Sequence, residues 1–280
     1  MHPYFLVLAL LGGTGLGAGP PDGTPGGHAV QDRDLPDHAA FTRVLQEVVT
    51  VPNVDYARLK ANRGGLDRYI RALGDTDPAR LSAAPRDEQL AFWINAYNAC
   101  MLRIVIDNYP IERQRVGLFQ RARIAVAGYP ANSVWQIRDV FSARHCEVAG
   151  ARRSQDEIEH EIIRPQFQEP RIHFAVNCAA RSCPVLWPEA YTGERLEEQL
   201  ERAVRNLVAS PAHFRVVTEN GPALHLNRVL DWYSGDFGGV EGLRTFFLPY
   251  LEGETLAQVR DTGTPIRFFD YDWTLNDTSR

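Results

Sequence analysis

The sequence predicts a single α+β domain, with several helices around one long buried helix and with short, mostly antiparallel strands. Three observations support this fold class. Apolar residues recur at helical spacing in several separate segments, and one long segment is apolar on almost every side. Short stretches of alternating polar and apolar residues lie between them, without the regular strand-helix alternation of a doubly wound sheet.

The composition is that of an ordinary globular chain. Of its 280 residues, 44% are hydrophobic and 23% are charged, and the net charge is −5. A chain with net negative charge has no global positive field that would attract nucleic acid. Lys60 is the only lysine, which excludes a Gly-Lys-Ser/Thr phosphate loop. We therefore expect no nucleic-acid partner. We also expect no cofactor, and a monomer that acts on a small-molecule or peptide substrate.

Residues 1–19 predict a secretory signal peptide, because a short apolar run is followed by small residues and a processing site near Ala18. Residues 20–35 are rich in proline and glycine and lack an apolar period, as in a flexible linker. The apolar run is much shorter than the roughly 20 residues that span a bilayer, so no integral membrane span is expected. We expect an exported protein, periplasmic or secreted, with one globular domain at residues 36–276.

Helical spacing predicts the first elements of this domain. Residues 41–49 form an amphipathic helix that ends before Pro52, and residues 66–73 form another that closes at Gly74. Residues 85–108 begin with a proline and acidic residues, which favour a helix start, and are apolar on nearly all sides. This helix is expected to be central and buried.

Shorter elements follow the long helix. Strands are expected at residues 124–126 and around Val148. Ser154 followed by Glu157 is a capping box that begins a helix, and Pro165 is expected to end it. The remaining expected elements are a strand at 172–178, a helix at 194–209, strands near Val216 and Leu224, helices near Leu230 and Leu243, and a strand at 266–269.

The segment RIHFAVNCAARSCPVLWP, residues 171–188, carries the most chemistry. In a strand, His173 and Asn177 would share one face, and the chain would leave the strand through Cys178 and Cys183. Polar side chains and two sulfur atoms would then converge at one strand end.

Pro184 is suited to the first position of a short helical turn. Ser182 or Cys183 would then occupy the N-cap, where the helix dipole favours an anion and lowers the pKa of a cysteine.

Three interpretations of these two cysteines remain open. In the first, they are a disulfide-bonded structural pair, which is common in exported proteins, or simply small core residues. Alternatively Cys183, or with less support Cys178, is a nucleophile with His173 or His160 as base. A metal site with His173 is the third interpretation, but without a Cys-x-x-Cys or His-Glu-x-x-His motif no metal is expected.

Other polar residues have a structural and a functional interpretation. His160 and Arg164 lie four residues apart, either on a solvated charged face or as a base and an anion clamp in a cleft. Asn95 and Asn98 on the long buried helix either hold a neighbouring loop or orient an imidazole or a substrate. Asp236 is a candidate third catalytic group, although capping of the helix near Leu243 is the favoured interpretation.

Aromatic residues are dense in the C-terminal run FFDYDWTLND, residues 268–277. An aromatic final strand usually closes a core. The other interpretation is a platform for carbohydrate or peptide.

Five motifs occur in a fixed order along the chain. They are FWINAYNA at 92–99, IEHEIIR at 158–164, RIHFAVNCAARSCP at 171–184, LDWYSGDF at 230–237 and YDWTLN at 271–276. Together they closely resemble domain of unknown function family 547, over about residues 80–276. That family, found in bacteria and in plant and animal proteins, has no settled biochemical activity. The resemblance therefore implies a fold and a set of site positions rather than a reaction.

The resemblance also implies which residues matter. The matched signature positions are Asn95, Tyr97, Asn98, His160, Arg164, His173, Asn177, Cys178, Ser182, Cys183, Pro184, Trp232, Tyr233, Asp236, Tyr271, Asp272, Trp273 and Asn276. Ala179 is a departure, because it stands where the family has glycine.

Two functional hypotheses follow from the residues and the resemblance. The first is a thiol-dependent hydrolase or acyl transferase that acts on peptide or cell-envelope material, with Cys183 as nucleophile. Its site would gather Cys183, Cys178, His173 and His160, with Asn95, Asn98, Arg164, Asn177, Ser182 and Asp236 binding or orienting. The second is a non-catalytic binding or scaffold module in which Cys178 and Cys183 form a structural pair and aromatic residues make the contact surface.

Overall fold

The computed structural model describes residues 35–112, 118–219 and 221–278. The described residues all belong to one compact unit. The expected signal peptide and all but the last residue of the expected linker lie outside the described residues.

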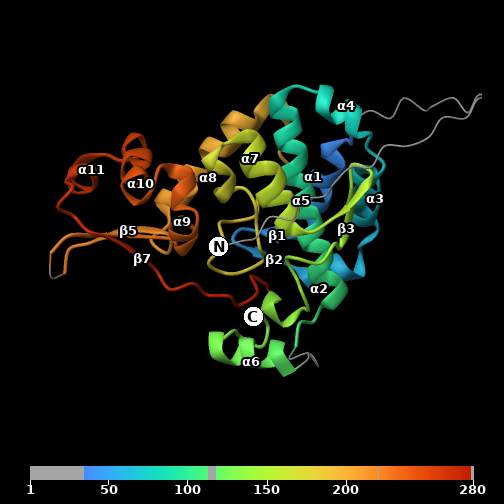
Figure 1. The fold of residues 1–280 in the computed structure, drawn as a ribbon, viewed down its shortest axis with the longest axis horizontal. Coiled ribbons are helices and arrows are strands. Elements are labelled where there is room, and N and C mark those ends of the chain that lie inside the picture. Colours follow the sequence, from blue (N-terminus) through green and yellow to red (C-terminus); the bar gives the residue numbers. More distant parts are fainter. Residues whose placement is uncertain (1–34, 113–117, 220, 279–280) are drawn as a thin grey trace, which may run out of the picture. The chain divides into compact units, whose positions relative to one another are not determined.

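Most of the described chain is helical, as Figure 1 shows. The α-helices are α1 (His38–Val48), α2 (Tyr56–Ala61), α3 (Gly64–Gly74), α4 (Pro78–Ala83), α5 (Arg86–Asn108), α6 (Leu118–Ala127), α7 (Arg164–Phe167), α8 (Leu196–Ala209), α9 (Arg228–Trp232), α10 (Val240–Phe247) and α11 (Gly253–Arg260). The strands are β1 (Val49–Thr50), β2 (Asn53–Val54), β3 (Cys146–Val148), β4 (Ala151–Arg153), β5 (Phe214–Val217), β6 (Ala223–Leu226) and β7 (Ile266–Phe268). None of the described helices is long and apolar enough to cross a membrane.

The strands form small separate sheets. β1 pairs with β2 and β3 pairs with β4, both antiparallel. In the third sheet β6 lies between β5, which is antiparallel to it, and β7, which is parallel. The predicted α+β class with short, mostly antiparallel strands is confirmed.

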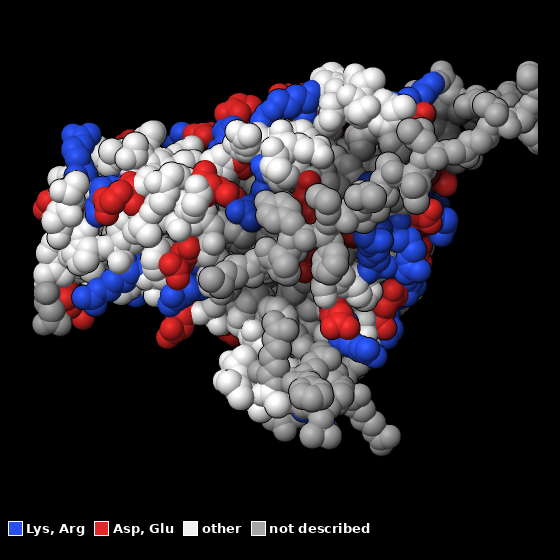
Figure 2. Space-filling view, in the orientation of Figure 1, with Lys and Arg blue, Asp and Glu red and all other residues white. Residues whose placement is uncertain are grey.

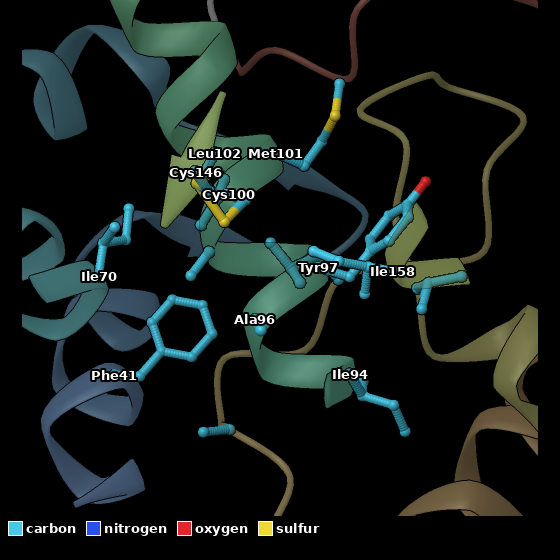
Figure 3. Close-up of a cluster of buried hydrophobic side chains, with 14 of the residues drawn as sticks. Phe41, Ile70, Ile94, Ala96, Tyr97, Cys100, Met101, Leu102, Cys146 and Ile158 are labelled. Atoms are coloured by element: carbon cyan, nitrogen blue, oxygen red, sulfur yellow. A yellow bond between two sulfur atoms is a disulfide. The ribbon is translucent and has the colours of Figure 1, made fainter. Parts of the chain in front are cut away.

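Helix α5 is the predicted central helix, and its side chains are buried almost without interruption from Leu90 to Ile106. It contacts α2 and α3 as well as α8. In Figure 3, Phe41 from α1 and Ile70 from α3 approach it from one side, and Ile158 approaches from the other. Burial on all sides explains why apolar residues cover nearly the whole circumference of this helix.

A second hydrophobic cluster packs the β5–β6–β7 sheet against α8, α9 and α10. Ile172 belongs to the first cluster, around α5, whereas Phe174 belongs to the second. The cysteine-containing segment therefore begins where the two hydrophobic clusters meet.

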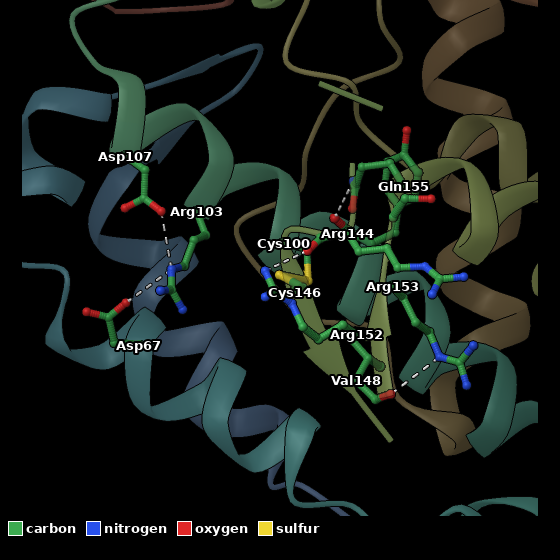
Figure 4. Close-up of a disulfide and its surroundings, with 12 residues drawn as sticks. Asp67, Cys100, Arg103, Asp107, Arg144, Cys146, Val148, Arg152, Arg153 and Gln155 are labelled. Carbon is green, nitrogen blue, oxygen red and sulfur yellow. Dashed lines mark hydrogen bonds and ion pairs between the residues drawn. A yellow bond between two sulfur atoms is a disulfide. The ribbon is translucent and has the colours of Figure 1, made fainter. Parts of the chain in front are cut away.

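A disulfide joins Cys100 on α5 to Cys146 on β3 (Figure 4). The hairpin of β3 and β4 is also held to the end of α3, because Ala149 N–H donates to Leu73 O and Gly150 N–H donates to Gly74 O. Cys100 lies on the helix at residues 85–108 that the sequence predicts to be buried, and the local sequence around Cys146 indicates no partner for it. The alternative of a structural pair between Cys178 and Cys183 is wrong, since both of these cysteines are free.

The expected strand at residues 124–126 is wrong, because this stretch is the end of helix α6. Val126 is 90% exposed, so its apolar side chain does not mark a buried strand face. Alanine-rich sequence favours helix once burial does not select for a strand.

Charged side chains of both signs are interspersed over the described residues in Figure 2. This distribution fits the net charge of −5. It gives no broad positive surface on the face shown.

Candidate functional site

A π-helix, η2 (Glu157–Ile163), carries two of the site's side chains. It begins with the predicted capping box, which is confirmed. Ser154 N–H donates to Glu157 Oε2 at 2.8 Å, and Glu157 N–H donates to Ser154 Oγ at 3.1 Å. A π-helical stretch is rare and is found frequently at functional sites.

Pro165 does not end this helix, contrary to the prediction. The chain continues into α7, and Arg164 N–H bonds to Glu159 O in the wider π register. Proline has no N–H group to donate to the helix. The wider π register at this junction accommodates the missing hydrogen bond.

The expected strand at residues 172–178 is also wrong. Pro170–Phe174 is a 3₁₀-helix, η3, whose N-cap Glu169 accepts a hydrogen bond from Arg171 N–H. His173 and Phe174 are both buried, so the alternation of polar and apolar residues does not correspond to two faces of a sheet.

Buried amides hold the chain that follows η3. Asn98 on α5 donates to Ala175 O at 2.9 Å and accepts from Asn177 N–H at 2.9 Å. Asn177 in turn donates to Pro184 O at 2.7 Å and accepts from Ala179 N–H at 2.9 Å. The two Asn98 bonds hold the backbone before Cys178 to the central helix, and the two Asn177 bonds hold the backbone that follows Cys178.

Asn95 makes an equivalent pair of bonds to a different loop. Its amide donates to Tyr191 O at 2.7 Å and accepts from Tyr191 N–H at 2.9 Å. The interpretation that the α5 amides hold neighbouring loops therefore describes the contacts of both Asn95 and Asn98.

The C-terminal segment closes over the cysteine loop. Asp272 N–H donates to Ser182 Oγ at 2.9 Å, and Ser182 N–H donates to Asp272 O at 3.2 Å. Ala180 forms an antiparallel bridge with Leu275. This pairing brings Tyr271 beside Cys178, although the two residues are 93 positions apart in the sequence.

Ala179 has a φ of +64°, in the left-handed region that favours glycine. This geometry explains why the resemblance implies glycine at the position. The methyl group is accommodated here, and Ala179 N–H still reaches Asn177.

The two sulfur atoms have different surroundings. Cys178 is partly exposed, and its Sγ lies 3.1 Å from Tyr271 Oη. Cys183 is 6% exposed, and its Sγ accepts a hydrogen bond from Cys178 N–H at 3.1 Å. Neither sulfur has an imidazole as hydrogen-bond partner among the described residues.

Hydrogen bonds lower the pKa of Cys178 and burial raises the pKa of Cys183. The pKa of Cys178 falls chiefly because the Cys183 thiol donates to its sulfur, with Tyr271 Oη and the Ala180 N–H assisting against the cost of burial. Burial raises the pKa of Cys183, and the neighbouring Cys178 raises it further. Burial likewise raises the pKa of Tyr271, which therefore keeps its proton as a donor.

The expected helical turn at Pro184 is absent from the described chain, which has no regular structure from Pro184 to Trp187. No helix dipole therefore acts on Ser182 or Cys183, and the expectation of a lowered pKa at Cys183 is wrong. Hydrogen-bond donors from the cysteine loop and from the distant Tyr271 act instead, and they lower the pKa of Cys178.

Asp236 joins Arg164 and His173. Arg164 donates to both carboxylate oxygens, at 2.6 and 2.8 Å, and His173 Nε2 lies 2.8 Å from Oδ2. Because a carboxylate only accepts, Nε2 of His173 carries the hydrogen. These contacts, first with His173 and then with Arg164, hold the pKa of Asp236 well below its usual range.

The favoured interpretation of Asp236 as a helix cap is wrong, since Gly239 is the N-cap of α10 and no side chain caps that helix. His173 is almost fully buried, with 1% of its side chain exposed, and its ring stacks on Tyr233 at 4.1 Å. The ring of His173 is thus held between Asp236 and Tyr233.

Glu159 and His160 face the same region from η2. The Glu159 side chain is 8% exposed, and its Oε1 lies 3.9 Å from Nδ1 of both His160 and His173. Arg164 Nη1 donates to His160 Nδ1 at 3.3 Å, which places the imidazole hydrogen of His160 on Nε2. Oε1 of Glu159 and Nδ1 of His173 have no hydrogen-bond partner in the described part of the chain.

These groups surround one pocket of about 340 Å³. Cys178, Cys183, His160, His173 and Glu159 line it together with aromatic rings. The aromatic residues at its wall are Tyr97, Tyr129, Trp135, Phe141, Trp232, Tyr233, Tyr271 and Trp273. In the described ranges, no group of three or more His, Cys, Asp or Glu side chains is arranged to hold a metal ion.

The structure thus brings Cys178, Cys183, His160 and His173 to one pocket, and Asn98, Asn177, Ser182 and Asp236 support it. Asn95 holds a loop elsewhere, and Arg164 lies beside the pocket. From the sequence, Tyr271 and Tyr233 are named only as signature positions of the resemblance, without a role at the site, and Glu159 is not singled out. All three lie in the motifs YDWTLN, LDWYSGDF and IEHEIIR, so motif membership is the signal available.

Comparison with known families identifies part of the chain. The model of the family described as protein of unknown function, DUF547, matches residues 81–208. This chain contains a DUF547 region. That DUF547 region includes α5, η2 and the cysteine loop, whereas the motifs at 230–237 and 271–276 lie beyond it. No solved structure matches the chain.

One prediction concerns the Asp236 network beside the DUF547 region. The folded-state pKa of Asp236 is depressed, so its stabilisation is complete above its unfolded pKa of about 3.9 and is lost as pH falls through the folded value. Asp236→Asn should lower the free energy of unfolding at pH 7 by about 1.5–3 kcal/mol, the value of hydrogen bonds to a charged group. It should also flatten the loss of stability below about pH 4.

Urea unfolding from pH 7 down to pH 3 measures both effects. Asp270→Asn is the matched control, because Asp270 is fully exposed. If Asp236→Asn and Asp270→Asn give the same stability and the same acid dependence, the network contributes nothing to the fold.

Proposed function

We propose that the protein is a thiol-dependent hydrolase or acyl transferase with Cys178 as its nucleophile. The observation that carries the proposal is the set of donors around one partly exposed sulfur. Tyr271 Oη lies 3.1 Å from Cys178 Sγ at the wall of a 340 Å³ pocket. A thiolate held by hydrogen-bond donors is a nucleophile at neutral pH without a paired imidazole base.

The chemistry at this sulfur has two steps. The Cys178 thiolate adds to an acyl carbon, a C–S bond forms, and the bond to an amine or alcohol leaving group breaks. The leaving group takes its proton from solvent, and the water or acceptor that attacks in the second step returns a proton to solvent. Water or a second acceptor then attacks the thioester, which releases the acyl product and restores the thiolate.

Cys178 replaces Cys183 as the favoured nucleophile. Cys183 is more deeply buried, has a raised pKa, and is engaged as a partner of Cys178. In this proposal Cys183 positions and stabilises the reacting sulfur.

Export of the protein is part of the same proposal. Disulfides persist in oxidising compartments and are rare in reducing ones, and the Cys100–Cys146 bond supports such a compartment. Peptide or cell-envelope material is the substrate class that fits this location. Mass measurement of the protein isolated from its cells should show an N-terminus near residue 19.

Alkylation kinetics test the nucleophile. With the disulfide intact, iodoacetamide should modify Cys178 first, with a rate that rises at lower pH than for an ordinary cysteine. Tyr271→Phe should slow the reaction at pH 7 several-fold, because it removes a hydrogen bond to the charged sulfur. Tyr250→Phe is the matched control, since Tyr250 donates to Glu201 instead.

Preferential alkylation of Cys183, or no alkylation of either cysteine in the folded protein, would exclude this function. Equal rates for the Tyr271 and Tyr250 variants would remove the proposed role of Tyr271.

A second candidate is the non-catalytic binding module. Trp232 is 48% exposed and stacks on Trp273 at 5.7 Å with 19° between the rings, as a contact platform would. A protein with an unreactive Cys178 that still binds ligand at these rings would favour this function.

A further inference from the structure

The pocket has acidic side chains and no counterbalancing lysine or arginine among the described residues that line it. Glu159 and Asp156 both line it, from the start of η2 and the residue before it. Arg164 is close, but Asp236 binds it through both carboxylate oxygens. The positive charge of Arg164 is therefore already compensated.

Glu159 has an unsatisfied carboxylate oxygen. Its side chain is 8% exposed, and Oε1 has no hydrogen-bond partner within the described residues. The nearest imidazole nitrogens are 3.9 Å away, beyond hydrogen-bond range. A buried carboxylate oxygen without a donor is costly, and a ligand N–H group would supply the missing donor.

The charged groups around the pocket sum to a net negative charge. Glu159, Asp156 and a Cys178 thiolate make three anions around the pocket, and the two histidines would supply at most two positive charges. In the observed contact with Arg164, moreover, Nδ1 of His160 is an acceptor. The potential inside the pocket is therefore negative and favours a cation.

Aromatic rings next to the sulfur strengthen this preference. Tyr271, whose hydroxyl contacts Cys178, packs against Trp232 at 4.8 Å and against Trp273 at 4.5 Å. Aromatic faces attract ammonium groups through their quadrupole, and tryptophan does so most strongly. Rings and carboxylates thus surround the place where a substrate approaches the thiol.

We infer that the substrate carries a cationic ammonium group, which the pocket recognises through Glu159, Asp156 and the aromatic wall around Tyr271. This inference rests on the proposed function, since it concerns the same pocket and the same sulfur. It specifies the substrate class further, as an acyl compound with an amino group near the reacting carbonyl.

Charged thiol reagents test the inference without a known substrate. Aminoethyl, hydroxyethyl and sulfonatoethyl methanethiosulfonates are cationic, neutral and anionic. Each transfers its ethylthio group to a thiolate, forms a mixed disulfide and releases methanesulfinate. We expect the ratio of cationic to anionic rate constants at Cys178 to exceed that of a free small thiol by about tenfold or more, and to fall with added salt.

Glu159→Gln should lower this ratio several-fold. Glu161→Gln is the matched control, because Glu161 lies on the same helix, is exposed and does not line the pocket. Asp156→Asn is a second variant at a more exposed position, in case Glu159→Gln impairs folding, and it should also lower the ratio.

The outcomes separate the two proposals. If Cys178 reacts with none of the three reagents, the thiol function itself fails. If it reacts but its charge ratio equals that of the small thiol, or if neither Glu159→Gln nor Asp156→Asn changes the ratio, the inferred cationic substrate is wrong while the nucleophile stands.

Discussion

Replacing both Cys100 and Cys146 by alanine is expected to lower the free energy of unfolding by about 4 kcal/mol, the loop-entropy value for a bond of this span. The two cysteines are separated by 46 positions and join α5 to the β3–β4 hairpin. Without the bond the unfolded chain gains conformational freedom, whereas the native hairpin still keeps its hydrogen bonds to α3. Denaturant unfolding of both proteins under oxidising conditions measures the difference.

Reductant provides the control for this prediction. Reduction should destabilise the wild-type protein by a similar amount and should leave the double variant unchanged. If the wild-type protein is insensitive to reductant while its thiols become titratable, the bond does not stabilise the fold.

Asn98→Ala is expected to lower the free energy of unfolding by about 2–4 kcal/mol and to slow alkylation of Cys178. The variant leaves Ala175 O and Asn177 N–H without their partner inside the core, and each unpaired buried group costs about 1–3 kcal/mol. It also frees the backbone that leads into Cys178, so the sulfur no longer meets Tyr271 in one fixed geometry.

Asn95→Ala is the matched control on the same helix. Asn95 is equally buried and makes the same two kinds of bond, but to Tyr191. Its loss should cost similar stability and leave the alkylation rate of Cys178 unchanged. If both variants slow alkylation equally, the effect is a general loosening of the core and Asn98 has no specific role at the sulfur.

Much of the fold could be predicted because local patterns and burial agree. Helix α5 is buried on all sides, so its sequence is apolar on all sides, and the prediction of residues 85–108 agrees with Arg86–Asn108. The capping box at Ser154 is a contact between residues three apart, which a sequence displays directly.

The errors arise where a distant residue determines the structure. His173 is polar yet buried, because Asp236, 63 positions away, accepts a hydrogen bond from its Nε2. The alternation near His173 therefore did not describe a strand. The turn at Pro184 is replaced by bonds from Asn177 and from the C-terminal segment. Cys100 and Cys146 carry no local signal of their pairing.

The sequence predicted which residues form the site better than it predicted the role of each residue. The motifs brought Cys178, Cys183, His160 and His173 together as candidates, and one pocket contains all four. The choice between the two cysteines depends on Tyr271, whose contact with Cys178 spans 93 positions and cannot be read from spacing. Asp236 likewise received a local interpretation as a cap, whereas its partners are Arg164 and His173.

The role of Cys178 as nucleophile is tested most directly by mapping the acyl group after reaction with an activated ester such as p-nitrophenyl acetate. Rapid quenching and peptide mass analysis should find the acetyl group on Cys178, as a thioester that hydroxylamine removes. Cys178→Ser should abolish both the labelling and the release of p-nitrophenol above the rate without protein. Acetylation at another residue, or p-nitrophenol release that persists in the Cys178→Ser variant, would contradict the proposed function.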